Sequence, residues 1–235
     1  MFRRYLTILS VIFVLALFGS NVFAQSQNRR SVRLTEGQVI IDRVVSVASP
    51  VRDVPFGSGS RVSWGEGTVG SLVTPSGNII SMTETVGVVN QLQFNGTEPV
   101  QVISGGVTIV GSLPDAVPEK IALVVNGEVI TVTVPVGAVA GVGLIVVGGN
   151  VQMEVVAASG GNLVLQDQRR NSIVVGAGEQ VSTTGIGGLG LSDFEVVNAP
   201  TVLLSRILRQ LEYTAGISNI FLRQLEYTAG ISNIQ

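Results

Sequence analysis

The chain of 235 residues contains no cysteine and no histidine. Without cysteine there is no disulfide framework and no thiol nucleophile, so burial and hydrogen bonds have to hold the fold. Without histidine there is no Ser-His-Asp triad and no ordinary zinc site. Chemistry would have to rest on carboxylates, hydroxyls, arginines or Lys120, the one lysine. We therefore expect a protein that is not an enzyme and that holds no cofactor and no metal.

Charge and aromatic residues are also scarce. Charged residues make up 13% of the chain and aromatic residues 5%. Since no basic cluster is available to neutralise phosphates, we expect no nucleic-acid partner. Apolar residues reach 46%, which is enough for a packed core and is not typical of a disordered polar chain.

The first residues follow the order of a secretory signal peptide. Arg3 and Arg4 precede an apolar run over residues 5–18, and the small residues Val22 and Ala24 stand just before Gln25. The run is too short to span a bilayer comfortably, although an uncleaved anchor is an alternative. We predict a signal peptide over residues 1–24, export to the periplasm or the extracellular space, and no integral membrane span after the leader is removed.

Most of the remaining chain has the pattern of β structure. From residue 37 to about residue 184, short runs rich in Val, Ile and Thr alternate with Gly, Asn, Ser and Pro, which is typical of strands and turns. Turn signals recur about every ten residues. We predict an all-β, glycine-rich antiparallel sandwich, barrel or short β-solenoid over residues 37–184. Residues 25–36, polar and basic, are predicted to form a flexible lead-in.

Three dipeptides mark expected turns within this domain. Asn126-Gly127 and Asn95-Gly96 each separate two strand-like runs. Asn-Gly supplies the positive φ angles of a two-residue hairpin turn, so we expect hairpins at both places. Gly105-Gly106 is a further turn signal.

The end of the chain changes character. We predict a glycine-rich linker over residues 185–197 and a helical tail over residues 198–235, starting near Pro200. Four apolar residues share one face of the expected amphipathic helix: Leu204, Ile207, Leu208 and Leu211. Gly216 is a plausible end of that helix.

The tail contains a duplicated segment of fourteen residues. Residues 208–221 and 222–235 are identical except that the first copy ends in Phe221 and the second in Gln235. We interpret this as an in-frame duplication. A pair of docking helices and an oligomerisation device are the alternatives, because fourteen residues equal two heptads.

Candidate site residues are few. Trp64 is the only tryptophan. If it is exposed on a β surface, it is a candidate contact for a sugar or a partner protein; a buried core position is the alternative.

Two further residue patterns bear on chemistry. Four carboxylates would support glycoside chemistry if two of them met, but their spacing does not require it: Asp42, Asp53, Glu66 and Glu84. Gly185, Gly187 and Gly190 match a dinucleotide-binding pattern, but no amphipathic helix opens there, so we interpret them as a loop.

Residues 129–185 resemble the later part of a FecR-type domain. The segment Thr-Val-Pro-Val-Gly-Ala-Val-Ala-Gly-Val-Gly over residues 133–143 is similar to the family's small-residue element. The segment Ser-Ile-Val-Val-Gly-Ala-Gly-Glu-Gln-Val over residues 172–181 is similar to its closing strand, and residues 57–62 to an earlier one. The resemblance implies an all-β exported bacterial domain used for sensing or binding, with no catalytic residues.

Taken together, these observations predict a non-catalytic exported binding or scaffold module of the bacterial cell envelope, with an envelope glycan or a protein as partner. A self-associating surface or fibre protein is the alternative, because low charge protects strand edges poorly. A carboxylate-dependent carbohydrate-active enzyme is a second alternative.

Overall fold

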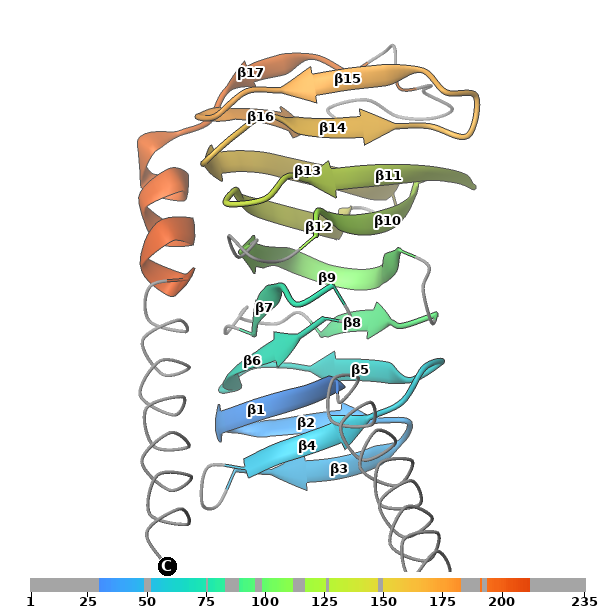
Figure 1. Cartoon of the computed structure of the whole chain (residues 1–235), viewed down its shortest axis with the longest axis vertical. Helices are drawn as coiled ribbons and strands as arrows, with labels where there is room; N and C mark the ends of the chain where they lie inside the picture. Colours follow the sequence, from blue (N-terminus) through green and yellow to red (C-terminus); the bar gives the residue numbers. More distant parts are fainter. Residues whose placement is uncertain are drawn as a thin grey trace, which may run out of the picture.

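The computed structural model describes residues 30–48, 52–74, 76–82, 89–95, 99–111, 117–125, 127–147, 150–182, 191 and 194–211. The predicted signal peptide, the glycine pattern over residues 185–190 and the second copy of the duplication lie outside these residues. The described part is an all-β protein with one C-terminal helix over residues 201–211 (Figure 1). The predicted fold class is therefore confirmed.

The described strands form two sheets that share strand β9. Sheet A contains, in spatial order, β4 (Arg52–Phe56), β1 (Arg30–Glu36), β6 (Val69–Val73), β7 (Ile79–Met82), β9 (Val100–Gly111), β12 (Val139–Val147), β13 (Asn150–Ser159), β16 (Glu179–Ser182) and β17 (Val196–Asn198). Sheet B contains β3 (Val44–Val47), β2 (Gln38–Ile41), β5 (Arg61–Trp64), β8 (Asn90–Gln93), β9, β10 (Glu119–Val125), β11 (Glu128–Val134), β14 (Leu163–Gln166) and β15 (Ser172–Val175). All pairs are antiparallel except β9 with β10.

The two sheets enclose one apolar core. Leu72 and Ile80 from sheet A and Leu92 and Leu123 from sheet B belong to the same buried cluster. Because side chains alternate along a strand, the residues between these positions form the outer faces. Among the described strands, β4 and β17 end sheet A and β3 and β15 end sheet B, so the architecture is an open sandwich.

The two predicted Asn-Gly hairpins have different outcomes. Val125 pairs with Glu128, and Gly127 has φ of 85°, so the predicted two-residue turn between β10 and β11 is confirmed. Strands β8 and β9 also form a hairpin, but the last register pair is Gln93 with Gln101. The connection is therefore longer than two residues, and the predicted tight turn at Asn95-Gly96 is wrong.

Gly105-Gly106 is not a turn, because both residues lie inside β9. On one side of them, Ser104 pairs with Gln91 of sheet B; on the other, Gly105 pairs with Leu144 of sheet A. The glycines therefore mark the place where one strand passes from one sheet to the other. Glycine suits a sharp bend because it has no side chain to obstruct it.

The boundaries of the β domain are wider than predicted. Residues 30–36 of the expected flexible lead-in form β1, whose Val32 and Leu34 are fully buried. At the other end, Leu191 and Phe194 of the expected linker are buried in the core, and β17 pairs with β16. The predicted flexible lead-in and the predicted linker are therefore wrong for these residues. Their apolar residues are scattered among polar ones in the sequence, but they become core residues because neighbouring strands supply hydrogen-bond partners for the backbone.

The predicted amphipathic helix is confirmed over residues 201–211. The carbonyl of Pro200 accepts hydrogen bonds from the amides of Leu203 and Leu204, so the helix begins at the expected proline. Ile207 is buried and Leu204 and Leu211 are partly buried. The predicted end at Gly216 lies outside the described residues. No helix among the described residues is long and apolar enough to cross a membrane.

Candidate binding groove

The outer face of sheet B is hollowed over strands β2, β5 and β8. The hollow has a volume of about 590 Å³. Six polar residues line it: Asp42, Arg43, Arg61, Ser63, Gln91 and Gln93. We call this hollow the groove.

Strand register places the groove side chains on one face. Arg61 lies opposite Gln93, and Ser63 opposite Gln91, on adjacent strands β5 and β8. The intervening residues Val62 and Leu92 belong to the apolar core. Since successive side chains of a strand point to opposite faces, the four polar residues face outward together.

Hydrogen bonds hold these side chains in place. Arg61 Nε donates to Gln93 Oε1 over 3.2 Å, and Gln93 Nε2 donates to the carbonyl oxygen of Gly59 over 2.6 Å. Gln91 Nε2 donates to Ser63 Oγ over 3.0 Å. A guanidinium has five N–H donors, so Arg61 keeps donor capacity beyond the bond to Gln93. The groove is thus a pre-ordered set of hydrogen-bonding groups.

The β2–β3 turn closes one end of the groove. Asp42 and Arg43 have φ of 49° and 74°, and Ile41 pairs with Val44 around them. Two consecutive positive φ angles are those of a type I′ hairpin turn, which here is made without glycine. Such a conformation costs free energy for a residue like arginine and has to be held by its surroundings.

Asp42 holds this turn against the neighbouring loop. Its carboxylate accepts hydrogen bonds from Ser60 Oγ over 2.6 Å and from the Arg61 amide over 2.8 Å. The hydrogen bond from Ser60, followed by the one from the Arg61 backbone, lowers the pKa of Asp42 below its ordinary value of 3.8. Asp42 is therefore ionised at neutral pH and serves as an acceptor.

The polar row through the groove continues across the rest of sheet B. Cross-strand register connects one residue on each of seven strands: Arg61, Gln93, Gln101, Ala122, Thr131, Gln166 and Ser172. Side chains that can donate or accept hydrogen bonds occupy all of these positions except Ala122. An extended ligand lying across these strands, which are spaced about 4.8 Å apart, would meet a hydrogen-bonding side chain at every strand except β10.

Trp64 does not contribute to this surface. It is 3% exposed and belongs to the apolar core between the sheets. The candidate role of Trp64 as an exposed ligand or partner contact is therefore wrong, and the alternative of a buried core tryptophan is correct. Its indole Nε1 is buried without a hydrogen-bond partner. Sequence reasoning missed the groove because its residues are ordinary polar strand positions that only register brings together.

Two of the four candidate catalytic carboxylates, Asp42 and Asp53, have separate structural partners. Asp42 accepts hydrogen bonds in its turn, and Asp53 of β4 forms an ion pair with Arg33 over 3.2 Å. Glu66 is exposed in the turn between β5 and β6, and Glu84 lies outside the described residues. Within the described ranges, no cluster of three or more His, Cys, Asp or Glu residues is able to hold a metal ion.

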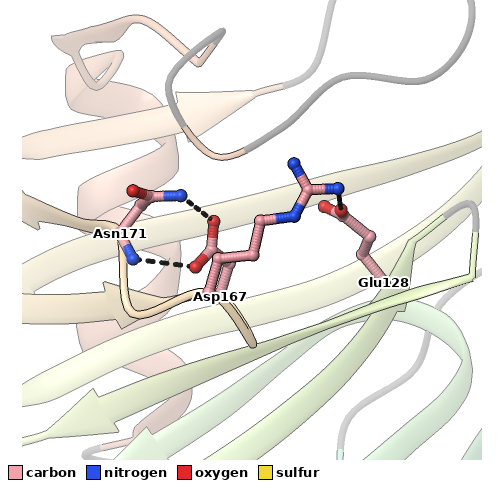
Figure 2. Close-up of polar contacts among 4 residues, drawn as sticks. Glu128, Asp167 and Asn171 are labelled. Carbon is pink, nitrogen blue, oxygen red and sulfur yellow. Dashed lines mark hydrogen bonds and ion pairs between the residues drawn. The ribbon is translucent and has the colours of Figure 1, made fainter.

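A second set of polar contacts lies at the β14–β15 turn (Figure 2). Asp167 accepts hydrogen bonds from the backbone and the side-chain amide of Asn171 over 2.8 and 2.7 Å, and Arg169 forms an ion pair with Glu128 over 3.3 Å. Burial acts to raise the pKa of Asp167, but the bonds from Asn171 and the backbone and charge of Arg169 outweigh it and lower that pKa. Both carboxylates are thus engaged in stabilising the turn.

No known protein family, curated protein or solved structure matches the chain. What the fold and the groove define is a class of architecture: an open two-sheet β-sandwich with a polar hollow on one outer face.

Proposed function

We propose that the protein is a non-catalytic exported binding module of the bacterial cell envelope and that it binds a glycan in the groove on sheet B. The groove carries the proposal because it presents two arginines, one carboxylate and two amides in a hydrogen-bonded arrangement. Amides and carboxylates bind hydroxyl groups, and guanidinium groups also bind carboxylates in a fixed planar geometry. A hydroxyl-rich chain that carries acidic sugars fits this set of donors and acceptors.

The shape of the site also supports a polymer. A hollow of about 590 Å³ suits a few sugar units rather than a protein surface. The polar row beyond it would support the flanking part of an extended chain. The resemblance of residues 129–185 to FecR-type domains agrees with an exported binding role.

A glycan array and calorimetry with purified envelope polysaccharides would test this proposal. We expect the parent chain to bind at least one acidic glycan and the double variant Arg61→Ala/Gln93→Ala to lose at least about tenfold in affinity, which corresponds to about 1.4 kcal/mol. The matched control is Arg209→Ala/Gln168→Ala, which removes the same side-chain types from exposed positions outside the groove. Equal binding by the parent and the groove variant, or no glycan binding by the parent, would contradict the proposal.

A second candidate is self-association through strand edges, because both ends of sheet B carry exposed valines. Val44 of β3 is 65% exposed and Val174 of β15 is 53% exposed, and each of these strands has one paired neighbour among the described strands. Exposed apolar edge strands readily pair with another chain. Light scattering after size exclusion separates the two functions. A monomer favours the binding module. Large assemblies that disappear in the Val44→Lys and Val174→Lys variants favour self-association.

A further inference from the structure

The groove on sheet B is not polar throughout. Its lining also includes Ile40 of β2 and Val89, which stands just before β8. Ile40 is 37% exposed and Val89 is 60% exposed. Exposed apolar side chains beside hydrogen-bonding groups in one hollow are able to contact an apolar part of the ligand that the polar groups hold.

Strand register divides the lining into two rows that cross β2, β5 and β8 or their ends. The charged row consists of Asp42, Arg61 and Gln93. The neutral row lies two residues away along each strand and consists of Ile40, Ser63 and Gln91. Since a strand rises about 3.3 Å per residue, the rows are about 7 Å apart. Val89 follows two residues beyond Gln91, so the groove has a charged end and an apolar end.

Gln91 presents a hydrogen-bond acceptor next to the apolar end. Its Nε2 donates to Ser63 Oγ over 3.0 Å, which fixes the orientation of the side-chain amide. Its Oε1 accepts no hydrogen bond from any residue in the described part of the chain. An amide oxygen has two acceptor positions, so Oε1 is available to a donor on a ligand.

An N-acetyl group on a sugar matches an acceptor that stands beside an apolar side chain. The acetamide is planar and trans, so its N–H and its methyl group lie on the same edge. A residue that accepts from the N–H therefore stands next to the residue that contacts the methyl group, as Gln91 stands next to Val89. A sugar hydroxyl in the same place would use Gln91 and leave Val89 and Ile40 in contact with water.

We propose that the groove recognises a glycan in which an N-acetylated amino sugar is itself acidic or is linked to an acidic sugar. This inference rests on the proposed glycan-binding function and names its ligand class. The ligand carboxylate binds the guanidinium of Arg61 at the charged end. The acetamido N–H donates to Gln91 Oε1, and the methyl group contacts Val89 and Ile40. Because the two rows are about 7 Å apart, both groups come from the same sugar or from adjacent sugars.

The small extent of the apolar end limits the apolar group that it binds. Val45 of β3 lies opposite Ile40 and is 54% exposed, so it extends the apolar end by one side chain. On the other side of Ile40 the neutral row becomes polar, with Ser63 and Gln91. The apolar end therefore fits a methyl group or another short substituent, and a fatty acyl chain would lie mostly over polar side chains.

Calorimetric titration with hyaluronan oligosaccharides tests the proposal, because they alternate a uronic acid with an N-acetylated amino sugar. The matched probe carries N-formyl in place of N-acetyl, which keeps the amide N–H and removes only the methyl group. Oligogalacturonate, which has carboxylates and no amide, is the third probe. We expect the parent to bind the N-acetyl probe about fourfold more tightly than the N-formyl probe, the worth of one buried methyl group. Oligogalacturonate should bind at least about tenfold more weakly than the N-acetyl probe.

A substitution at the apolar end identifies the residue that reads the methyl group. Val89→Ser should remove the preference for N-acetyl over N-formyl and leave the affinity for oligogalacturonate unchanged. The matched control is Val174→Ser, because Val174 is an exposed valine of the same sheet that lies outside the groove. This control should keep the fourfold preference. A preference that persists in Val89→Ser would overturn the proposal.

The remaining outcomes separate this inference from the proposed function. Equal affinities of the parent for the N-acetyl and N-formyl probes would overturn the inference and leave the glycan-binding function in place, since the charged end would still bind the acid. Failure to bind any of the three acidic probes would contradict both. A dimer on light scattering that Val89→Ser dissociates would show that a second copy of the chain covers the apolar end, which would also overturn the inference.

Discussion

Arg61 on β5 donates a hydrogen bond from Nε to Oε1 of Gln93 on β8, directly opposite in the register of sheet B. Both side chains lie on the outer face, and Gln93 is anchored in turn on the carbonyl of Gly59. The orientation of the Arg61 guanidinium therefore depends on the side-chain amide of Gln93. That amide lies on β8, two strands away from the β2–β3 turn that closes one end of the groove. This coupling makes the groove sensitive to residues that need not touch a ligand.

Gln93→Ala should weaken glycan binding by about tenfold, since Arg61 loses the group that orients it. The free energy of unfolding should change by less than about 1 kcal/mol, because the bond is exposed. Calorimetric titration and urea unfolding measure the two effects. Gln168→Ala, which removes an exposed glutamine outside the groove, should change neither. Unaltered affinity in Gln93→Ala would mean that the amide does not position Arg61.

Asp42 should make stability fall in acid. Its folded-state pKa lies below the ordinary value of 3.8, so its contribution is fully present above that value. The contribution disappears as the pH falls through the lowered folded-state pKa. Asp42→Asn should therefore be less stable than the parent at neutral pH, and the difference should shrink below pH 3.8. Urea unfolding over a pH series would show this; a constant difference would contradict it.

Glu154 should have the opposite pH dependence. Burial raises its pKa above the ordinary value of 4.5, and the charge of Arg206 on the helix only partly offsets this. The ionised carboxylate therefore destabilises the fold progressively as the pH rises from 4.5 through the raised pKa. Glu154→Gln should raise the Tm at neutral pH and have no effect in acid. Arg206→Ala should lower the Tm at neutral pH, and calorimetry at both pH values measures these changes.

Trp64→Ala should destabilise the protein by about 3–5 kcal/mol, because it leaves a large cavity in the core. Trp64→Phe should cost much less, since it keeps an aromatic ring and removes a buried N–H that has no partner. Urea unfolding separates the two variants. As the only tryptophan, Trp64 should also show blue-shifted emission in the native state. Emission typical of solvent-exposed indole would contradict its burial.

Gly37→Ala should be strongly destabilising. Gly37 has φ of 77°, and a Cβ there would collide with the backbone carbonyl of Gly67. We expect a loss of about 2 kcal/mol or more in the free energy of unfolding. Gly57→Ala is the matched control, because its nearest added contact is Ser60 Oγ at 3.9 Å. Similar losses in the two variants would show that the backbone near Gly37 relaxes.

Local sequence was a sufficient guide wherever the structure depends on near neighbours. Asn126-Gly127 predicted its hairpin because the turn is formed by adjacent residues. Val129, Thr131 and Thr133 alternate with Ile130, Val132 and Val134, which is the period-two pattern of a half-buried strand, and the second set is buried. The helix near Pro200 was predicted for the same reason.

Predictions failed where distant strands decide the outcome. Residues 30–36 look polar and basic, yet β1 is paired on both sides, by β4 and β6. Gly105-Gly106 looks like a turn, yet β9 passes through it because each half pairs with a different sheet. The position of Trp64 likewise follows from which face of β5 meets the opposite sheet.

The amino-acid sequence by itself determined that this protein is built of strands, has a terminal helix, and lacks imidazole and thiol chemistry, because those properties follow from residue type and short-range periodicity. Tertiary structure alone decided that Asp42, Arg61, Gln91 and Gln93 form one groove, since the register of three strands from separate parts of the chain brings them together. It also decided which face the C-terminal helix covers, because that depends on where the sheet leaves room for a helix to pack.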